Sequence, residues 1–280
     1  MNSKVLIITG MHRSGTSVLT QWLNRCGLFI GNKLVGPDLG NIQGHFEDCE
    51  FLSLHQEFLK KRKLADVGFV NRPFPELNTS ETDQIENLVE TRNKEHYTWG
   101  WKDPRTCLFL DMYRKIIPSA RYIIIVRGYN STVSSLVRRE HKMILKKLKS
   151  KDYLSKLKWR LFRKKKLEKP FEYFSERFLR IWVYYYQQIF KHVDRLPPDS
   201  YRFVHYDQLL QNDSEVFSKL TNDWHFSLQY VPFSDVSRSD LISEGQNIER
   251  YITDKNLLEK AKAIEKRTHD LLHPVKAEFV

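Results

Sequence analysis

The chain has 280 residues, of which 41% are hydrophobic and 29% are charged, a composition typical of a globular domain and unlike that of disordered or fibrous sequences. The formal net charge is +12, and no apolar run approaches the roughly 20 residues that a membrane-spanning helix requires. Only three cysteines are present and we recognise no export signal, so we expect a cytoplasmic protein without a disulfide framework. A peripheral location at the inner membrane surface is the alternative.

Short apolar runs alternate with longer amphipathic stretches along the chain. The runs rich in β-branched or aromatic residues predict strands at 4–9, 99–102, 121–126 and 201–206. Stretches with helical periodicity predict helices at 15–25, 48–62, 80–96, 105–116, from about 130 into a basic segment, at 172–195, 214–224 and 254–272. This alternation predicts one α/β domain over residues 1–280, in which helices flank a central parallel β-sheet.

The positive charge is concentrated in residues 138–169. This segment contains 15 Lys or Arg residues and three acids, while the rest of the chain has equal numbers of both signs. Apolar residues are interleaved with the charges, which predicts a basic helical insertion at about 138–170. It is interpreted as a solvated helical face, as a contact for an anionic membrane surface or as a site for a polyanionic substrate. Nucleic acid is not expected, because no base-reading motif accompanies the charge.

Residues 10–17 join the first predicted strand to the first predicted helix. A glycine-bounded loop in this position directs several backbone N–H groups to the positive end of the helix dipole. Ser14, Thr16 and Ser17 add hydroxyl donors and Arg13 adds a cation, so the loop predicts a phosphate or sulfate site. A nucleoside-triphosphate loop would carry its lysine at Thr16, which disfavours the alternative of a P-loop nucleotide kinase or NTPase.

The segment Arg13-Ser14-Gly15-Thr16-Ser17 resembles the 5′-phosphosulfate loop of sulfotransferases that use 3′-phosphoadenosine 5′-phosphosulfate (PAPS), and its arginine is similar to that of the bacterial branch. This family binds the donor's 3′-phosphate with an arginine that ends a strand and a serine eight residues later. Arg127 and Ser135 match that spacing, and Asn130 is predicted to cap the helix that carries the serine. The resemblance implies seven donor-binding residues: Arg13, Ser14, Gly15, Thr16, Ser17, Arg127 and Ser135.

The resemblance also implies a general base near residues 44–48. In glycan and tyrosylprotein sulfotransferases a glutamate in a similar position takes the acceptor proton, which assigns that role to Glu47. The spacing around the histidine differs between branches, so Asp48 and His45 remain alternatives.

Residues 99–105 resemble the family's Lys-Asp/Ser-Pro motif. The resemblance implies that Lys102 contacts the sulfuryl oxygens or keeps Glu47 ionised, and that Arg13 stabilises the charge of the leaving phosphate. Asp103 is expected either to orient Arg13 or Arg105, or to cap the following helix.

The predicted function is therefore transfer of a sulfuryl group from PAPS to an acceptor hydroxyl, on a carbohydrate or glycolipid, without a metal. The Gly-x-x-Gly-x-Trp-Lys motif of the cytosolic small-molecule branch does not occur after Pro232, which favours the bacterial, carbohydrate-type branch. Trp22 is a candidate wall for the adenine. Besides the kinase or NTPase, a polyanion- or membrane-binding protein with a decayed active site is an alternative.

Overall fold

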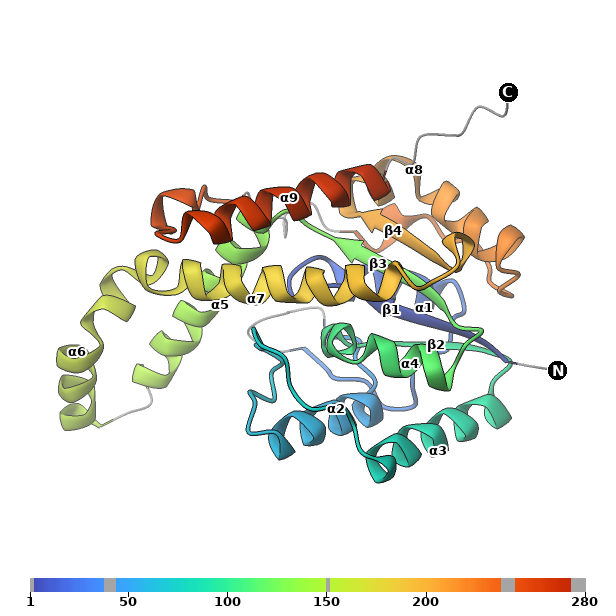
Figure 1. Ribbon diagram of the computed structural model, residues 1–280, viewed down its shortest axis with the longest axis horizontal. Coiled ribbons are helices and arrows are strands. Elements are labelled where there is room, and N and C mark those ends of the chain that lie inside the picture. The colour runs from blue at the N-terminus through green and yellow to red at the C-terminus, as the bar shows by residue number, and fades with distance from the viewer. Residues whose placement is uncertain (1–2, 38–43, 150–151, 238–244, 273–280) are drawn as a thin grey trace.

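The computed structural model of the protein describes residues 3–37, 44–149, 152–237 and 245–272, and for part of the helix at 153–168 only the backbone. Its centre is a four-stranded sheet of order β2-β1-β3-β4 with all neighbours parallel (Figure 1). The strands are β1 (Lys4–Thr9), β2 (Thr98–Lys102), β3 (Arg121–Val126) and β4 (Tyr201–His205). All four predicted strands are present within one residue at each end, and the predicted α/β class is confirmed.

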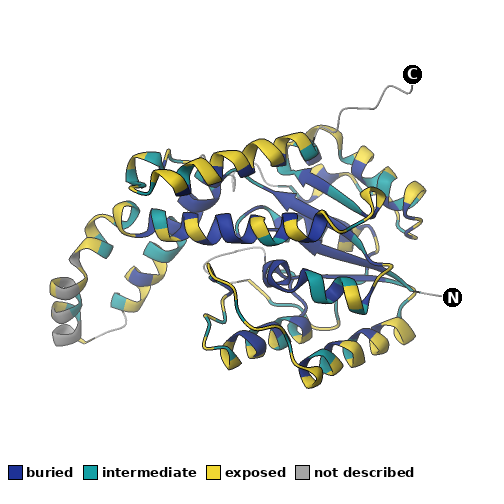
Figure 2. Cartoon of the chain, in the orientation of Figure 1, coloured by how far each residue is buried: buried dark blue, intermediate teal, exposed yellow. Residues whose placement is uncertain are grey.

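Helices cover both faces of the sheet. They are α1 (Thr16–Arg25), α2 (Cys49–Lys61), α3 (Thr79–Glu95), α4 (Leu110–Ile116), α5 (Tyr129–Lys149), α6 (Tyr153–Glu168), α7 (Pro170–Val193), α8 (Tyr206–Ser218) and α9 (Lys255–Leu272). A short 3₁₀ helix, η1 (Pro104–Leu108), follows β2. Strands β1, β2 and β3 are almost entirely buried and β4 is partly buried, whereas the outward faces of α3 and α9 are exposed (Figure 2).

The alternation of side chains along β1 divides the hydrophobic core into two halves. Val5 and Ile7 pack in the cluster that includes residues of α2, α5 and α7, whereas Leu6 and Ile8 pack in the cluster that includes residues of α1 and α8. Successive side chains of a strand point to opposite faces, so an uninterrupted apolar strand is stable only when both faces are covered.

The strand order reverses at the carboxyl ends of β1 and β3. The chain passes from β1 to β2 on one side, and then returns to β3 on the other side of β1. Ligands of open parallel sheets bind where the strand order reverses in this way. The loop after β1 and the residues after β3, which contain both predicted donor motifs, therefore lie at the same edge.

Two predicted helix caps and the extents of two predicted helices differ from those of the structure. α3 begins after Asn78, which forms a capping box with Glu81, and not after Ser80. Asn130 lies inside α5, where its Oδ1 accepts a hydrogen bond from the backbone N–H of Ile248, so it is not the cap. The helix predicted at 105–116 is divided into η1 and α4, and α8 begins at Tyr206, not near residue 214.

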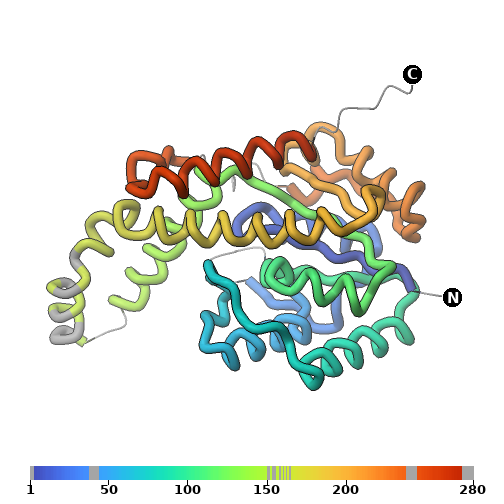
Figure 3. The backbone as a smooth tube through the Cα atoms, viewed as in Figure 1, coloured from blue at the N-terminus to red at the C-terminus, as the bar shows by residue number. Residues whose placement is uncertain are grey.

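The outer part of α5, together with α6, extends away from the sheet (Figures 1 and 3). α5 leaves the end of β3, α6 reverses the chain direction, and α7 returns along the body of the protein. We call residues 141–149 of α5 and residues 152–168 the basic arm. A helical basic segment was predicted here, and the structure describes it as two helices.

Candidate functional site

The loop after β1 is built so that its backbone turns sharply in front of α1. Gly10 crosses β3 so closely that a Cβ atom would lie 2.3 Å from the carbonyl oxygen of Ile125. Arg13 has φ 68° and Gly15 has φ 97°, both in the left-handed region. Within the described part of the chain no side chain caps α1, and its first turn carries no acid. Its N-terminal N–H groups are thus available to an anion at the positive end of the helix dipole.

The structure brings the two predicted donor motifs into direct contact. Nε of Arg13 donates a hydrogen bond to Oγ of Ser135 over 3.1 Å, and Nη1 of Arg127 donates to the carbonyl oxygen of Arg13 over 3.0 Å. Burial lowers the pKa of Arg127, and the neighbouring Arg138 lowers it further. A cation whose pKa is depressed by a neighbouring cation lies in a region of excess positive charge, which favours a bound dianion.

Tyr186 and Trp182 of α7 hold the backbone of Arg127 in place. The backbone N–H of Arg127 donates to the hydroxyl of Tyr186 over 3.1 Å, and that hydroxyl lies 3.1 Å from the carbonyl oxygen of Arg127. Nε1 of Trp182 donates to the same carbonyl over 3.3 Å. No role for these two residues was predicted from the sequence, although a buried tyrosine or tryptophan usually needs a polar partner.

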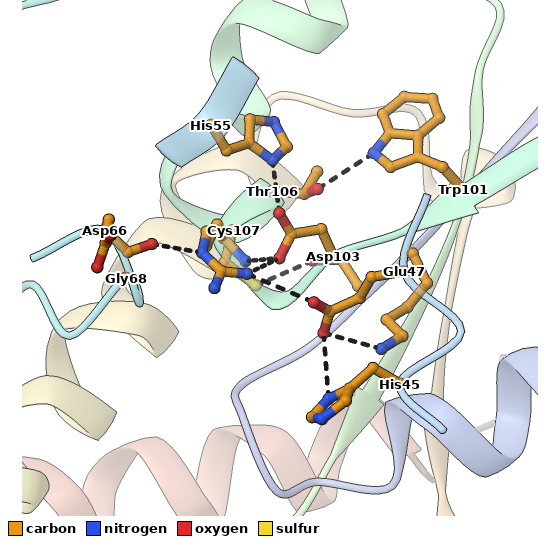
Figure 4. Close-up of polar contacts among 12 residues, drawn as sticks. His45, Glu47, His55, Asp66, Gly68, Trp101, Asp103, Thr106 and Cys107 are labelled. Carbon is orange, nitrogen blue, oxygen red and sulfur yellow. Dashed lines mark hydrogen bonds and ion pairs between the residues drawn. The ribbon is translucent and has the colours of Figure 1, made fainter. Parts of the chain in front are cut away.

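A second group of side chains gathers around Glu47, where the carboxyl ends of β1 and β2 meet. Nζ of Lys102 lies 3.1 Å from Oε1 of Glu47, and Nη1 of Arg105 lies 3.6 Å from Oε2 (Figure 4). Nζ of Lys102 also lies 3.4 Å from Oγ of Ser17, whose hydroxyl donates to the carbonyl oxygen of His45. Burial lowers the pKa of Lys102, and the carboxylate of Glu47 opposes this effect. The group therefore adjoins the first turn of α1.

Asp103 has both of the roles considered for it, with Arg105 as its partner. Its Oδ1 accepts hydrogen bonds from the backbone N–H of Arg105 and from Nη1 of the same residue, at 3.0 and 2.8 Å. Its Oδ2 lies 2.8 Å from Nδ1 of His55 (Figure 4). Nε2 of His55 lies 2.7 Å from the hydroxyl of Tyr113. Burial disfavours ionisation, but Arg105 and His55 outweigh it and hold the pKa of Asp103 far below its usual range. Asp103 thus orients the guanidinium beside Glu47.

Asp48, an alternative for the base, and Trp22, a candidate contact for the adenine, are engaged in other contacts. Asp48 caps α2 through the N–H of Glu50 and forms an ion pair with Arg92, so its buried carboxylate has a structural role, unlike that of Glu47. Trp22 is completely buried and its Nε1 donates to the carbonyl oxygen of Val231, so it cannot form a wall for adenine. Helix-face tryptophans are commonly core residues, and this one follows the rule.

His45 and His12 flank the Glu47 group. Nδ1 of His45 lies 4.0 Å from Oε1 of Glu47, close enough for an electrostatic contact. His12 is buried, and its Nε2 has no hydrogen-bond partner among the described residues. Burial, followed by the charge of Arg105, lowers the pKa of His12 well below its usual value. Its ring is therefore neutral at pH 7.

The part of the chain that the structure describes contains no group of three or more His, Cys, Asp or Glu side chains suited to a metal ion. Among the same residues, no helix has both the length and the apolar character needed to cross a bilayer.

Comparison with known proteins identifies the family of this chain. The sequence model of the sulfotransferase family matches residues 6–225, most of the chain and both groups of residues around the loop after β1. This chain belongs to the sulfotransferase family. No curated protein sequence gives a significant match to it.

Solved sulfotransferases share the fold at low sequence identity. The sulfotransferase STF9 from Mycobacterium avium is 15% identical, with 94% of this chain and 76% of that chain covered and a TM-score of 0.53. The sulfotransferase STF1 from Mycobacterium tuberculosis H37Rv is 12% identical, with 94% and 77% covered and a TM-score of 0.50. At such identities the likeness shows only that this sulfotransferase has the fold of its family.

Proposed function

We propose that this sulfotransferase transfers a sulfuryl group from PAPS to the hydroxyl group of a glycan or glycolipid. Membership of the family supports sulfuryl transfer. The observation that carries the choice of donor is the hydrogen-bonded chain from Ser135 through Arg13 to Arg127, because it joins the 5′-type loop to the strand-end arginine. A donor with phosphate groups on both the 3′ and 5′ oxygens spans two such sites, whereas an ordinary nucleotide occupies one.

The residues present fit such a donor. Gly15, Thr16 and Ser17 would hold the 5′-phosphate with backbone N–H and hydroxyl donors, with Ser14 beside them in the same loop. Arg127 and Ser135 would hold the 3′-phosphate, and Arg13 lies between the two ends. The excess positive charge around Arg127 and Arg138 supports the assignment, since a dianion would relieve the repulsion between the two guanidinium groups.

The group around Glu47 has the chemistry that the acceptor requires. Glu47 takes the proton of the acceptor hydroxyl. At the same time the oxygen of that hydroxyl forms a bond to sulfur, and the bond between sulfur and the bridging phosphate oxygen of the donor breaks. Lys102 and Arg13 stabilise the negative charge that develops on the departing phosphate. Arg105, oriented by Asp103, keeps the carboxylate of Glu47 in position.

The acceptor class is proposed from charge. A glycan or glycolipid with anionic groups is attracted by the strongly basic side of the molecule formed by residues 138–169. For a glycolipid, the same segment provides a contact with the anionic membrane surface that carries the acceptor. Transfer of radiolabelled sulfate across a panel of glycans, glycolipids and phenols identifies the acceptor, and exclusive transfer to phenols would overturn this part of the proposal.

Thermal unfolding with adenosine 3′,5′-bisphosphate, the product of the donor, tests the proposed function directly. A ligand that binds only the folded state stabilises it by about 2.7 kcal/mol at a hundred times its dissociation constant. We expect a clear rise in melting temperature with the bisphosphate and none with ATP and magnesium. Arg127→Ala should abolish the rise, whereas the control Arg121→Ala, at the opposite end of β3, should retain it. A rise with ATP alone would replace the proposal with a kinase or NTPase.

A further inference from the structure

The α5 part of the basic arm presents three lysines that no acid among the described residues neutralises. Lys142, Lys146 and Lys149 of α5 are exposed, and none of them forms an ion pair with a residue that the structure describes. On α2, by comparison, Lys60 pairs with Asp66, and Lys61 pairs with Glu57 one turn away. These three lysines thus form an exposed positively charged group with no ion-pair partner among the described residues.

The arm also exposes large apolar side chains on both of its helices. Leu161 is 69% exposed and Leu157 is 46% exposed, the two being four residues apart on α6 and therefore adjacent on one face of the helix. On α5, Met143 and Leu145 are also exposed. A leucine that remains in water contributes no free energy of burial to the stability of the protein. Leu157 and Leu161 would gain this free energy if the surface were covered.

We infer that the basic arm docks on the surface of an anionic lipid bilayer, with its lysines at the headgroup phosphates and Leu157 and Leu161 in the boundary with the acyl chains. A soluble polyanion would neutralise the lysines and leave the leucines in water. A bilayer accommodates both kinds of side chain, because interfacial helices combine basic residues with leucine or aromatic residues. The observations therefore favour lipid over a soluble polyanion.

The position of the arm relates this surface to the donor site. α5 starts three residues after β3 and carries both Ser135 and Lys146, about 16 Å apart along one helix at 1.5 Å per residue. A docked arm holds the carboxyl edge of the sheet near the headgroups. This consequence rests on the proposed function, under which the edge contains the donor, whereas docking itself does not depend on it.

Cosedimentation with vesicles tests the inference. The wild-type chain should bind vesicles of phosphatidylcholine with 30% phosphatidylglycerol and should not bind vesicles of phosphatidylcholine alone. Reversal of three arm charges, in Lys142→Glu/Lys146→Glu/Lys149→Glu, should weaken binding at least about 100-fold, since each lysine near an anionic surface contributes roughly fivefold. The matched control Lys255→Glu/Lys260→Glu/Lys266→Glu has the same net charge, with the changes on α9, and should bind nearly as well as wild type.

A second variant separates lipid from a soluble polyanion. Leu157→Ser/Leu161→Ser preserves every charge and should reduce vesicle binding at least tenfold, while heparin affinity stays unchanged. Equal binding of this variant to vesicles, or wild-type binding to heparin but not to vesicles, would overturn the inference. All variants should keep the melting shift with adenosine 3′,5′-bisphosphate, so failure of docking and failure of the proposed function are read separately.

Discussion

Lys102 and Glu47 form a buried ion pair with 3.1 Å between Nζ and Oε1, although 55 residues separate them in the sequence. Lys102 ends β2, and Glu47 lies two residues before α2. The pair connects the end of the sheet with the segment that precedes α2, and Ser17 of α1 is in contact with it. Three segments therefore depend on one another for the geometry of this site.

Replacement of Glu47 by glutamine should abolish turnover without affecting the donor site. The amide cannot accept the acceptor's proton, and general base catalysis contributes roughly 100- to 10,000-fold to a rate. Sulfate transfer from labelled PAPS should fall by at least about 100-fold, while the melting shift with the bisphosphate persists. Glu50→Gln on α2 is the control, and turnover near the wild-type rate in Glu47→Gln would assign the base to another residue.

Removal of Lys102 alone should destabilise the fold more than removal of both charges. Breaking a buried ion pair by deleting one partner costs about 3–5 kcal/mol, and the remaining contact with Arg105 places Lys102→Met near the lower value. In the double variant Lys102→Met/Glu47→Gln we expect recovery of at least about 1 kcal/mol, measured by urea unfolding. Additive losses would show that the two side chains are not coupled.

Substitution of Gly10 by alanine should prevent stable folding or cost about 3 kcal/mol or more. The new Cβ would lie 2.3 Å from the carbonyl oxygen of Ile125, which belongs to the sheet and cannot retreat. Gly36 is the matched control, because nothing lies within 4 Å of its Cβ position. Gly36→Ala should change the free energy of unfolding by less than about 0.5 kcal/mol. Similar losses in both variants would contradict the close crossing of the loop and β3.

Stability should fall as the pH decreases from about 6.5, partly because of His192. Burial lowers the pKa of this ring to about 4, below its value of about 6.5 in the unfolded chain. Between these values the unfolded state binds more protons, so the contribution of the neutral ring is complete above pH 6.5 and is lost toward pH 4. His12, whose pKa is also lowered by burial, acts in the same direction.

Urea unfolding between pH 7.5 and 4.5 measures this effect. A single buried histidine gives a slope of at most about 1.4 kcal/mol per pH unit within its window. His192→Phe should reduce the slope relative to that of the wild-type chain. An unaltered slope in His192→Phe would mean that this ring titrates alike in both states.

Much of the fold could be predicted because each strand is marked by a pattern of residues within a short stretch of sequence. The run from Lys4 to Thr9 is apolar at nearly every position, and only a parallel strand covered on both faces accommodates that pattern in five or six residues. Helix ends were less predictable, since several polar residues compete for each cap. Asn78, not Ser80, caps α3 because Glu81 stands at the position that completes the capping box.

The sequence by itself determined the α/β class, and it predicted an anion-binding loop at residues 10–17 that pairs with Arg127 and Ser135 as a donor motif, because these features depend on residue type and short spacing. Only the tertiary structure decided that Arg105 and Lys102 both hold Glu47, that Asp48 turns to Arg92 and that Trp22 belongs to the core. Such contacts join segments tens of residues apart, and their geometry is set by how helices pack on the two faces of the sheet, which no local pattern records.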